Sequence, residues 1–272
     1  MTDHTAVHTS FGVLGDPHKD FLWTKKALTK LLTAGVKQVH VLGDFGFVWH
    51  GAPQERNDLN RLTKVLADAD AYLYVTGGNH EGYAALNRHY PEDEHGYRHL
   101  TDRIIWLPRG WRGRSAAGTV VASLGGANSI DKGRRTPPVD GRGGSWWPEE
   151  QITEADLHRL GTDPVDVLLA HDAPRTQALA QKLYPNQHFW TREGLMYADM
   201  GQQMFQRGVE QVKPKVVLSG HYHLFLDTTE TFHDHAGNAF DTRSIILDCN
   251  GFSRSVAVFH PDTQTLRILP VV

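Results

Sequence analysis

The sequence predicts an α/β fold in which two mixed sheets pack face to face with helices outside, a four-layer α/β/β/α sandwich. Three observations predict it. Short apolar runs in the first half end in polar turns that contain glycine, as buried strands do. Segments with helical spacing of apolar residues separate these runs. The last third is strand-like throughout, with short turns and no helical segment.

The first half begins with a β-α-β-α-β pattern. Residues 11–14, 38–42 and 71–75 are the apolar runs, and residues 21–33 and 53–68 between them have helical spacing, with Pro53 suited to a first helical turn. Alternating strands and helices predict a largely parallel sheet, in which ligands gather beyond the carboxyl ends of the strands. The polar turns occupy those positions.

The middle of the chain predicts further strands at 103–107 and 119–124, followed by a long loop. Residues 125–147 are rich in Gly, Pro, Arg and Trp, and a loop of this length is uncommon in a compact domain unless it is a lid or a binding surface. A disordered linker is the alternative. Beyond the loop we expect helices at 148–160 and 193–211 and strands at 165–170, 216–219, 227–232, 243–249, 255–260 and 265–271.

Length and composition exclude several classes of protein. We expect one domain over residues 1–272. The formal charge of -3 gives no basic excess for extended nucleic-acid binding, so small anionic substrates stay open. No apolar run predicts a signal peptide or a membrane span, and the single cysteine, Cys249, fits a reducing cytoplasm, where we expect the protein. The sequence predicts no particular oligomeric state.

Polar residues recur in a fixed order after the predicted strands. They are Asp16-Pro17-His18, Gly43-Asp44, Gly78-Asn79-His80, His171 and Gly220-His221-Tyr222-His223. Oxygen and imidazole donors together suit divalent Mn, Fe or Zn, and there are more donors than one ion needs. In an extended segment, residues two apart face the same side, so Asp16 with His18, and His221 with His223, could each approach one metal cluster.

The ordered series resembles the calcineurin-like metallophosphoesterase superfamily, in its bacterial and phage phosphodiesterase-like branch. The pattern of that superfamily is D-x-H, G-D, G-N-H-[DE], a lone H and G-H-x-H, and here it spans residues 16–223. Each segment alone is weak evidence, since dipeptides such as Gly-Asp and Gly-Asn are common in turns, whereas the ordered set is specific to the superfamily.

The resemblance implies a centre of two divalent ions, for which we expect Mn, with Fe or Zn as alternatives. Asp16, His18, Asp44 and His223 would hold one ion, while Asp44, Asn79, His171 and His221 would hold the other, with Asp44 as the bridge. His80 would bind the phosphate and assist the leaving oxygen. The implied reaction is phosphoester hydrolysis by in-line attack of a metal-bridging hydroxide.

Two departures from the protein-phosphatase pattern narrow the substrate class. Phe47 occupies the position of an acid, and Gly77-Gly78 precedes Asn79 where an arginine is usual. Protein phosphatase activity is therefore less expected. The carboxylate that would orient His80 is also missing, which leaves Glu81 or Asp172 as candidates.

The long loop offers candidate substrate contacts at Asn128, Arg134 and Arg135, with aromatic faces at Trp146 and Trp147 for a nucleobase. Solvated arginines beside packed tryptophans are the alternative. We therefore expect a dinuclear metal-dependent phosphodiesterase, a phosphoric ester hydrolase acting on small phosphodiesters, with 2',3'-cyclic nucleotides first. A nuclease, a phosphomonoesterase or protein phosphatase of the same superfamily, and a non-catalytic scaffold are the alternatives.

Overall fold

The computed structural model describes residues 3–140 and 143–271. Two seven-stranded sheets form its centre. The strands of the first sheet are β2 (Phe11–Leu14), β3 (Gln38–Leu42), β4 (Tyr72–Thr76), β5 (Arg98–His99), β6 (Ile104–Trp106), β13 (Val256–His260) and β14 (Thr265–Ile268). Their order is β14-β13-β2-β3-β4-β6-β5. The strands β2, β3, β4 and β6 are parallel, and antiparallel strands lie on both sides of them.

The second sheet is mixed in the same way. Its strands are β1 (Ala6–Val7), β7 (Trp111–Ser115), β8 (Val120–Leu124), β9 (Val167–Ala170), β10 (Val216–Ser219), β11 (Leu226–His233) and β12 (Ala239–Ile246), in the order β1-β7-β8-β9-β10-β12-β11. A parallel centre runs from β8 to β12, and β7 and β11 pair antiparallel with its outer strands.

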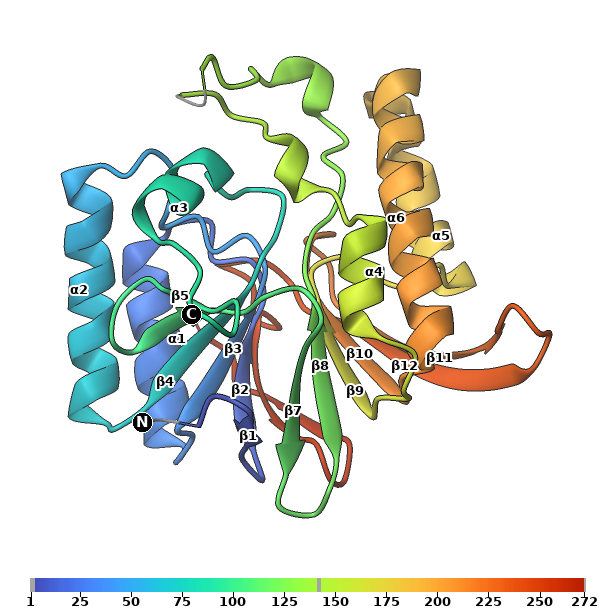
Figure 1. Cartoon of the computed structure of the whole chain (residues 1–272). Coiled ribbons are helices and arrows are strands. Elements are labelled where there is room, and N and C mark those ends of the chain that lie inside the picture. The colour runs from blue at the N-terminus through green and yellow to red at the C-terminus, as the bar shows by residue number, and fades with distance from the viewer. Residues whose placement is uncertain (1–2, 141–142, 272) are drawn as a thin grey trace.

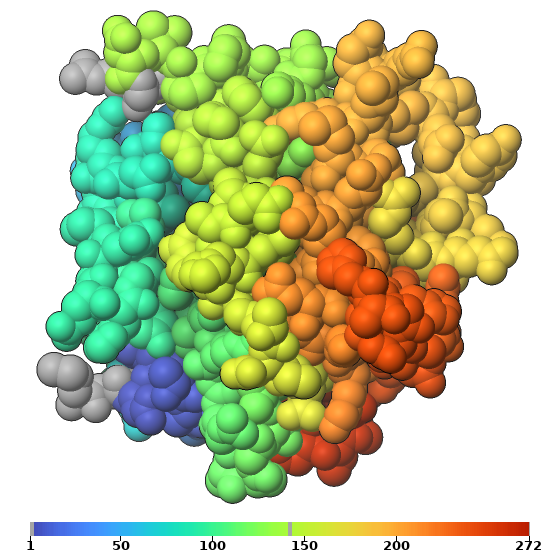
Figure 2. Space-filling model, turned by 45° about the vertical axis from the view of Figure 1, so that its right-hand side comes forward, coloured from blue at the N-terminus to red at the C-terminus, as the bar shows by residue number. Residues whose placement is uncertain are grey.

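Helices cover the outer face of each sheet, as Figure 1 shows. The helices are α1 (Phe21–Thr33), α2 (Pro53–Asp68) and α3 (Tyr83–His89) on one side and α4 (Glu154–Leu160), α5 (Gln177–Leu183) and α6 (Arg192–Val212) on the other. In Figure 2 the yellow-green segment that contains α4 and the orange segment that contains α6 lie side by side on the outer surface of this side. The predicted four-layer sandwich is thus confirmed.

The alternation of side chains along each strand explains the layers. In β9, Val167 and Leu169 belong to the apolar core between the two sheets, while Leu168 and Ala170 pack under the helices. In β3, Val39 and Val41 likewise face the first helical layer. Because both faces of these central strands are covered, their sequences are almost continuously apolar.

The largest correction to the expected elements concerns residues 148–160. In place of one helix there is a 3-10 turn at Pro148–Glu150, and α4 begins only at Glu154. The side chain of Thr153 accepts from the backbone N–H of Asp156, and the Asp156 side chain accepts from the N–H of Thr153. This reciprocal cap fixes the start of the helix.

The long loop lies across the carboxyl ends of the strands. The only regular element among its described residues is a 3-10 turn at Lys132–Arg134, as expected for residues 125–147. Residues 141 and 142 of this loop lie outside the described residues. In Figure 1 the loop, coloured green to yellow-green, stands above the two sheets and between the two helical layers.

Candidate metal centre

The candidate site is built by the turns that follow five parallel strands. Asp16 follows β2, Asp44 follows β3, Asn79 follows β4, His171 follows β9 and His221 follows β10. The first three come from one sheet and the last two from the other. Ligand sites of open α/β sheets form at this edge, where the turns of neighbouring strands converge.

The glycines of these turns are required by close approach of neighbouring groups. Gly43 has φ +96°, and a Cβ there would lie 2.1 Å from Nδ1 of His171. A Cβ on Gly220 would lie 2.0 Å from Oδ1 of Asp16. Any side chain at either position would displace a candidate ligand, so glycine is part of the site.

Four of the candidate ligands adopt the left-handed backbone conformation that non-glycine residues rarely occupy. They are His18, Asp44, His221 and His223, with φ of 45°, 48°, 70° and 50°. Each such residue stores of order 1–3 kcal/mol of strain, which the surrounding structure must offset. The segments are therefore not extended, and the argument that residues two apart face the same side was wrong. Tight turns bring His18 and His223 to Asp16 instead.

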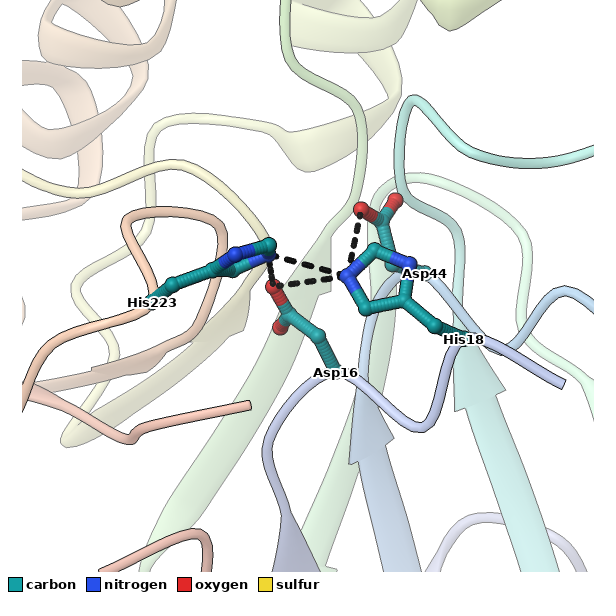
Figure 3. Close-up of side chains that lie close together, drawn as sticks. All are labelled: Asp16, His18, Asp44 and His223. Atoms are coloured by element: carbon teal, nitrogen blue, oxygen red, sulfur yellow. Dashed lines mark hydrogen bonds and ion pairs between the residues drawn. The ribbon is translucent and has the colours of Figure 1, made fainter. Parts of the chain in front are cut away.

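The first predicted set forms a compact cluster (Figure 3). One ligand atom from each of Asp16, His18, Asp44 and His223 lies within 4.8 Å of all the others. Nε2 of His223 is 3.2 Å from Oδ2 of Asp16, and Nε2 of His18 is 3.8 Å from Oδ2 of Asp44. The two carboxylates are buried, whereas His223 is exposed at the open side.

The donor set of this cluster fits a divalent cation. Nε2 of His18 lies 2.9 Å from Nε2 of His223, a distance at which two imidazole lone pairs repel unless a proton or a metal ion satisfies them. Two buried carboxylates stand beside these nitrogens. The hydrogen bond to Asp16 is the main reason that the pKa of His223 rises to about 10, and the same negative potential attracts a metal cation.

The second predicted set meets around His171. Nδ1 of this buried ring donates to the carbonyl oxygen of Leu42 at 2.8 Å, which leaves Nε2 facing the site. Nε2 lies 2.9 Å from Oδ1 of Asn79 and 3.1 Å from Oδ1 of Asp44. Burial alone would lower the pKa of His171, but Asp44 and Asp16 raise it to about 10. The same carboxylates would favour a cation in place of that proton.

His221 completes the neighbourhood of the second set. Its ring packs against His171 with centroids 4.8 Å apart. Its backbone N–H donates to Oδ2 of Asp16 at 2.9 Å, which links the two sets. Among the described residues, only the first set forms a compact group of His, Cys, Asp and Glu donors, and the second depends on the amide of Asn79.

Ser129 and Glu150 are site residues that the sequence did not single out. Nδ2 of Asn79 donates to Oγ of Ser129 at 3.0 Å, so Oδ1 of Asn79 is turned toward His171. Glu150, which is fully buried, accepts from both the N–H and the hydroxyl of Ser129. Ser and Glu in a loop carry no motif, so only their contacts reveal this role.

His80 lies beside the first set and faces the long loop. Its backbone N–H donates to Oδ1 of Asp44 at 2.7 Å, and its ring meets that of His18 with centroids 5.1 Å apart. The indole of Trp49 lies nearly parallel to it at 6.4 Å. On the loop side, Nη2 of Arg135 is 2.5 Å from Nε2 of His80.

Neither carboxylate considered for orienting His80 contacts it. Glu81 accepts from the backbone N–H groups of Phe45 and Gly46, and Asp172 accepts from the hydroxyl of Tyr222 at 2.6 Å. Burial and the nearby Asp44 raise the pKa of Glu81 to about 8. Both acids brace the turns behind the site, and the side chain next to Nε2 of His80 is Arg135.

The other loop residues have different surroundings. Asn128 is buried, and its amide donates to the carbonyl oxygen of Tyr197 in α6. Arg134 is exposed and lies over the ring of Trp190 at 5.6 Å. Trp147 is buried in the core against Trp49, so it offers no face to a nucleobase.

Trp146 makes contacts with other residues of the protein. Its indole N–H donates to Glu150 at 2.9 Å, and Lys132 lies over its ring at 4.1 Å. The expectation that Trp147 stacks on a base is corrected because its ring is buried, whereas stacking by Trp146 stays a prediction. Substrate contact by Asn128 or Arg134 stays a prediction.

Among the described residues, no helix is both long and apolar enough to cross a membrane.

Comparison with known proteins agrees with the geometry. A sequence profile described as calcineurin-like phosphoesterase matches residues 9–225. No curated protein matches the chain. Among solved structures, TT1561 of Thermus thermophilus is similar with a TM-score of 0.53 at 12% identity, over 97% of this chain and 99% of that chain. A dimetal phosphatase from Danio rerio gives a TM-score of 0.46 at 12% identity, over 92% of each chain.

At 12% identity the likeness to the Thermus protein is one of fold. The profile match covers every segment of the polar series, from Asp16 to His223. The resemblance deduced from those residues is thereby confirmed, and the chain belongs to the calcineurin-like phosphoesterase family.

Proposed function

We propose that this chain is a metal-dependent phosphodiesterase that hydrolyses small phosphodiesters, with 2',3'-cyclic nucleotides as the first candidates. The observation that carries the proposal is the position of His80. It lies at the edge of the donor cluster with its Nε2 directed at the long loop, so a phosphate held by the cluster would meet it.

Seven residues would hold two ions. Asp16, His18, Asp44 and His223 would hold the first, and Asp44, Asn79, His171 and His221 the second, with Asp44 shared. Bound divalent ions would neutralise phosphoryl oxygens and lower the pKa of water. The donors suit Mn, which we propose as the ion, with Fe and Zn as alternatives.

The residues of the chain supply orientation and a proton. Hydrolysis forms one P–O bond from water, which loses a proton to solvent, and breaks the P–O bond to the leaving alkoxide, which must gain a proton. We assign this proton to Nε2 of His80, because its ring lies beside His18 at the edge of the cluster. The Asp44 carboxylate and the Trp49 ring hold the backbone and the imidazole plane in position.

The position of the long loop favours a small substrate over a nucleic-acid polymer. The side chain of Arg135 is only 7% exposed and contacts Asn79 and His80, so this part of the loop lies against the His80 side of the site. The net charge of -3 supplies no basic excess for a nucleic-acid strand. A single cysteine fits the cytoplasmic location that we propose.

The test is an activity screen of the protein reconstituted with Mn, Fe or Zn. Substrates are 2',3'-cyclic, 3',5'-cyclic and singly phosphorylated nucleotides, together with single-stranded DNA and RNA. We expect metal-dependent turnover of at least one cyclic class and little turnover of polymers. Preferred cleavage of polymers, with affinity that falls steeply with salt, would show a nuclease instead. Turnover confined to monoesters would show a phosphomonoesterase.

A further inference from the structure

The long loop delivers one buried arginine to the site. Arg135 follows the 3-10 turn Lys132–Arg134 and reaches back to the turn that follows β4. Its Nη1 donates to the carbonyl oxygen of Asn79 at 3.3 Å, and its Nη2 lies 2.5 Å from Nε2 of His80. It thus joins the loop to the segment that carries one candidate ligand and the catalytic histidine.

The position of this arginine is fixed by its own partner. Nε of Arg135 pairs with Oδ1 of Asp131 at 2.7 Å, so one edge of the guanidinium is held and the other faces His80. Lys132 anchors the turn by lying between the rings of Trp146 and Tyr197, at 4.1 Å from each. The neighbouring Arg134 is exposed and points to Trp190. The turn therefore directs only Arg135, and not Arg134, to His80.

The contact with His80 excludes a second partner at the same atom. A guanidinium group only donates hydrogen bonds, so Nε2 of His80 must accept in this contact. Nε2 is also the atom that would give a proton to the leaving oxygen. Arg135 and that oxygen cannot both occupy this position, so Arg135 must take another acceptor when a substrate is bound.

A phosphate oxygen is the acceptor that suits it. Guanidinium groups bind phosphate oxygens through charge-assisted, often paired hydrogen bonds. A phosphate between the donor cluster and His80 would place an oxygen within a short movement of Nη2, while Asp131 keeps hold of Nε.

We propose that Arg135 is the phosphate-binding residue that the long loop supplies, and that it covers Nε2 of His80 until a phosphate oxygen takes over its Nη2. This inference rests on the proposed function for the location of the phosphate. It assigns Arg135, and not the exposed Arg134, as the specificity-determining cation of the loop.

The first test measures binding of inorganic phosphate to the metal-loaded protein by calorimetry. We expect R135A to bind phosphate about 10- to 100-fold more weakly than the unchanged protein, as loss of a hydrogen bond to a charged group implies. Arg114→Ala removes the same charge from β7, where the guanidinium donates to the carbonyl oxygen of Gly118, and should leave binding unchanged. Unchanged binding in R135A, or a larger loss in R134A than in R135A, would overturn the proposal.

The second variant guards against a folding defect. R135A leaves Asp131 without its partner, so thermal unfolding of each variant is recorded alongside binding. Arg135→Lys keeps the charge but lacks the fork, and we expect phosphate affinity between that of R135A and that of the unchanged protein. If R135A does not fold, R135K carries the test, and an affinity equal to that of the unchanged protein would contradict the inference.

The third test examines the cover over His80. Diethylpyrocarbonate modifies accessible, unprotonated imidazole nitrogens, and mass spectrometry locates the modified residues. In the metal-loaded protein, His80 should react faster in R135A than in the unchanged protein, while the exposed His158 should react at the same rate in both. Equal rates at His80 would show that Arg135 does not cover it.

Kinetics separate this inference from the proposed function. With any diester that the protein hydrolyses, R135A should raise KM, and added guanidinium should restore part of the lost kcat/KM. If no diester is hydrolysed, the proposed function fails, and phosphate binding and His80 reactivity still decide the role of Arg135. Turnover that R135A leaves unchanged, or that guanidinium does not restore, would contradict the role.

Discussion

Six histidines of this chain occupy three distinct environments, and each environment predicts a different response to substitution. His18, His171, His221 and His223 belong to the candidate metal centre with its carboxylates. His80 lies at its edge and contacts Arg135. His40 lies in the core between the sheets, packed among aromatic rings. Residue type alone could not separate these groups, but sequence order separated His80 and the ligands from His40.

His80→Ala should leave metal content unchanged while strongly lowering turnover. The imidazole donates no atom to either predicted ligand set, so metal binding does not depend on it. Loss of a general acid lowers rates by roughly 10²- to 10⁴-fold. Metal analysis and initial rates of the purified variant check both parts. His158→Ala, at an exposed position of α4, is the matched control. A variant of His80 with full activity would sink the assigned role.

His40 is a buried imidazole without a hydrogen-bond partner. Neither ring nitrogen finds one among the described residues, and the ring instead stacks on Tyr74 and meets the edge of Phe11. Burial lowers its pKa from 6.5 to about 3. The folded protein therefore keeps His40 neutral at pH values where the unfolded chain protonates it.

His40→Phe should make stability less sensitive to acid. Because the folded pKa lies below the unfolded one, the unfolded chain binds the extra proton between pH 6.5 and about 3, and stability falls as pH falls through this window. Between pH 7.5 and pH 5 this lowers the free energy of unfolding by about 2 kcal/mol. The free energy of unfolding of the variant, relative to that of the unchanged protein, should therefore rise by about 2 kcal/mol from pH 7.5 to pH 5.

Urea unfolding at pH 7.5 and pH 5 measures the effect of His40→Phe. His260→Phe, the same change at an exposed position of β13, is the control. An identical free-energy difference at both pH values would show that His40 is already protonated, or that it finds a partner, in the folded state.

At the scale of elements, the long loop is held by hydrogen bonds that meet at one serine. Ser129 accepts from Asn79 and donates its hydroxyl to Oε2 of Glu150 at 2.6 Å. Glu150 in turn accepts from the indole of Trp146, near the other end of the loop. The loop closure and the orientation of a candidate ligand therefore depend on the same group.

Ser129→Ala should weaken binding of one of the two proposed metal ions. Without the hydroxyl, the amide of Asn79 loses the contact that turns Oδ1 toward His171. Loss of such an outer contact typically lowers metal affinity by about 10- to 100-fold. Competition with a chelator should show that one metal ion per protein is bound more weakly and that the affinity for the other is unchanged. Ser145→Ala, which loses only the contact with the Thr136 N–H, is the matched control. Two unchanged equivalents would contradict the prediction.

The sequence predicted helices and strands well where a single pattern of apolar residues dominated the segment. The apolar runs of β2, β3, β9 and β10 are covered on both faces, so their positions were clear. The strand β7 was missed because its sequence, Trp-Arg-Gly-Arg-Ser, buries small and aromatic residues on one face only. The helices α3 and α5 have seven residues each, too few for a helical period to stand out.

At the scale of the whole molecule, the site joins the two sheets. Asp16, Asp44 and Asn79 follow strands of the first sheet, and His171 and His223 follow strands of the second. The sequence predicted the members of the site because their order matches a family pattern. It could not predict the left-handed turns, or that the candidate substrate contact Arg135 lies against His80, because these depend on contacts between residues far apart in the chain.

Metal binding should therefore stabilise the whole fold. An ion held by the first set would connect Asp16 and Asp44 of one sheet to His223 of the other, and the unfolded chain lacks this arrangement. A ligand that binds only the folded state adds about 2.7 kcal/mol at 100 times its dissociation constant. Unfolding midpoints recorded against Mn concentration should rise accordingly and return to the starting value when a chelator is added.

Two histidines, one in the turn that follows β10 and one in β11, provide the comparison that decides this prediction. His223→Ala removes a ligand of the first set and should reduce the stabilisation by Mn. His233→Ala removes an exposed histidine of β11 and should not. Because both variants lose one imidazole, nonspecific binding of the metal to surface histidines would affect them equally. Equal stabilisation of the two variants would mean that His223 does not contribute to a metal site that links the sheets.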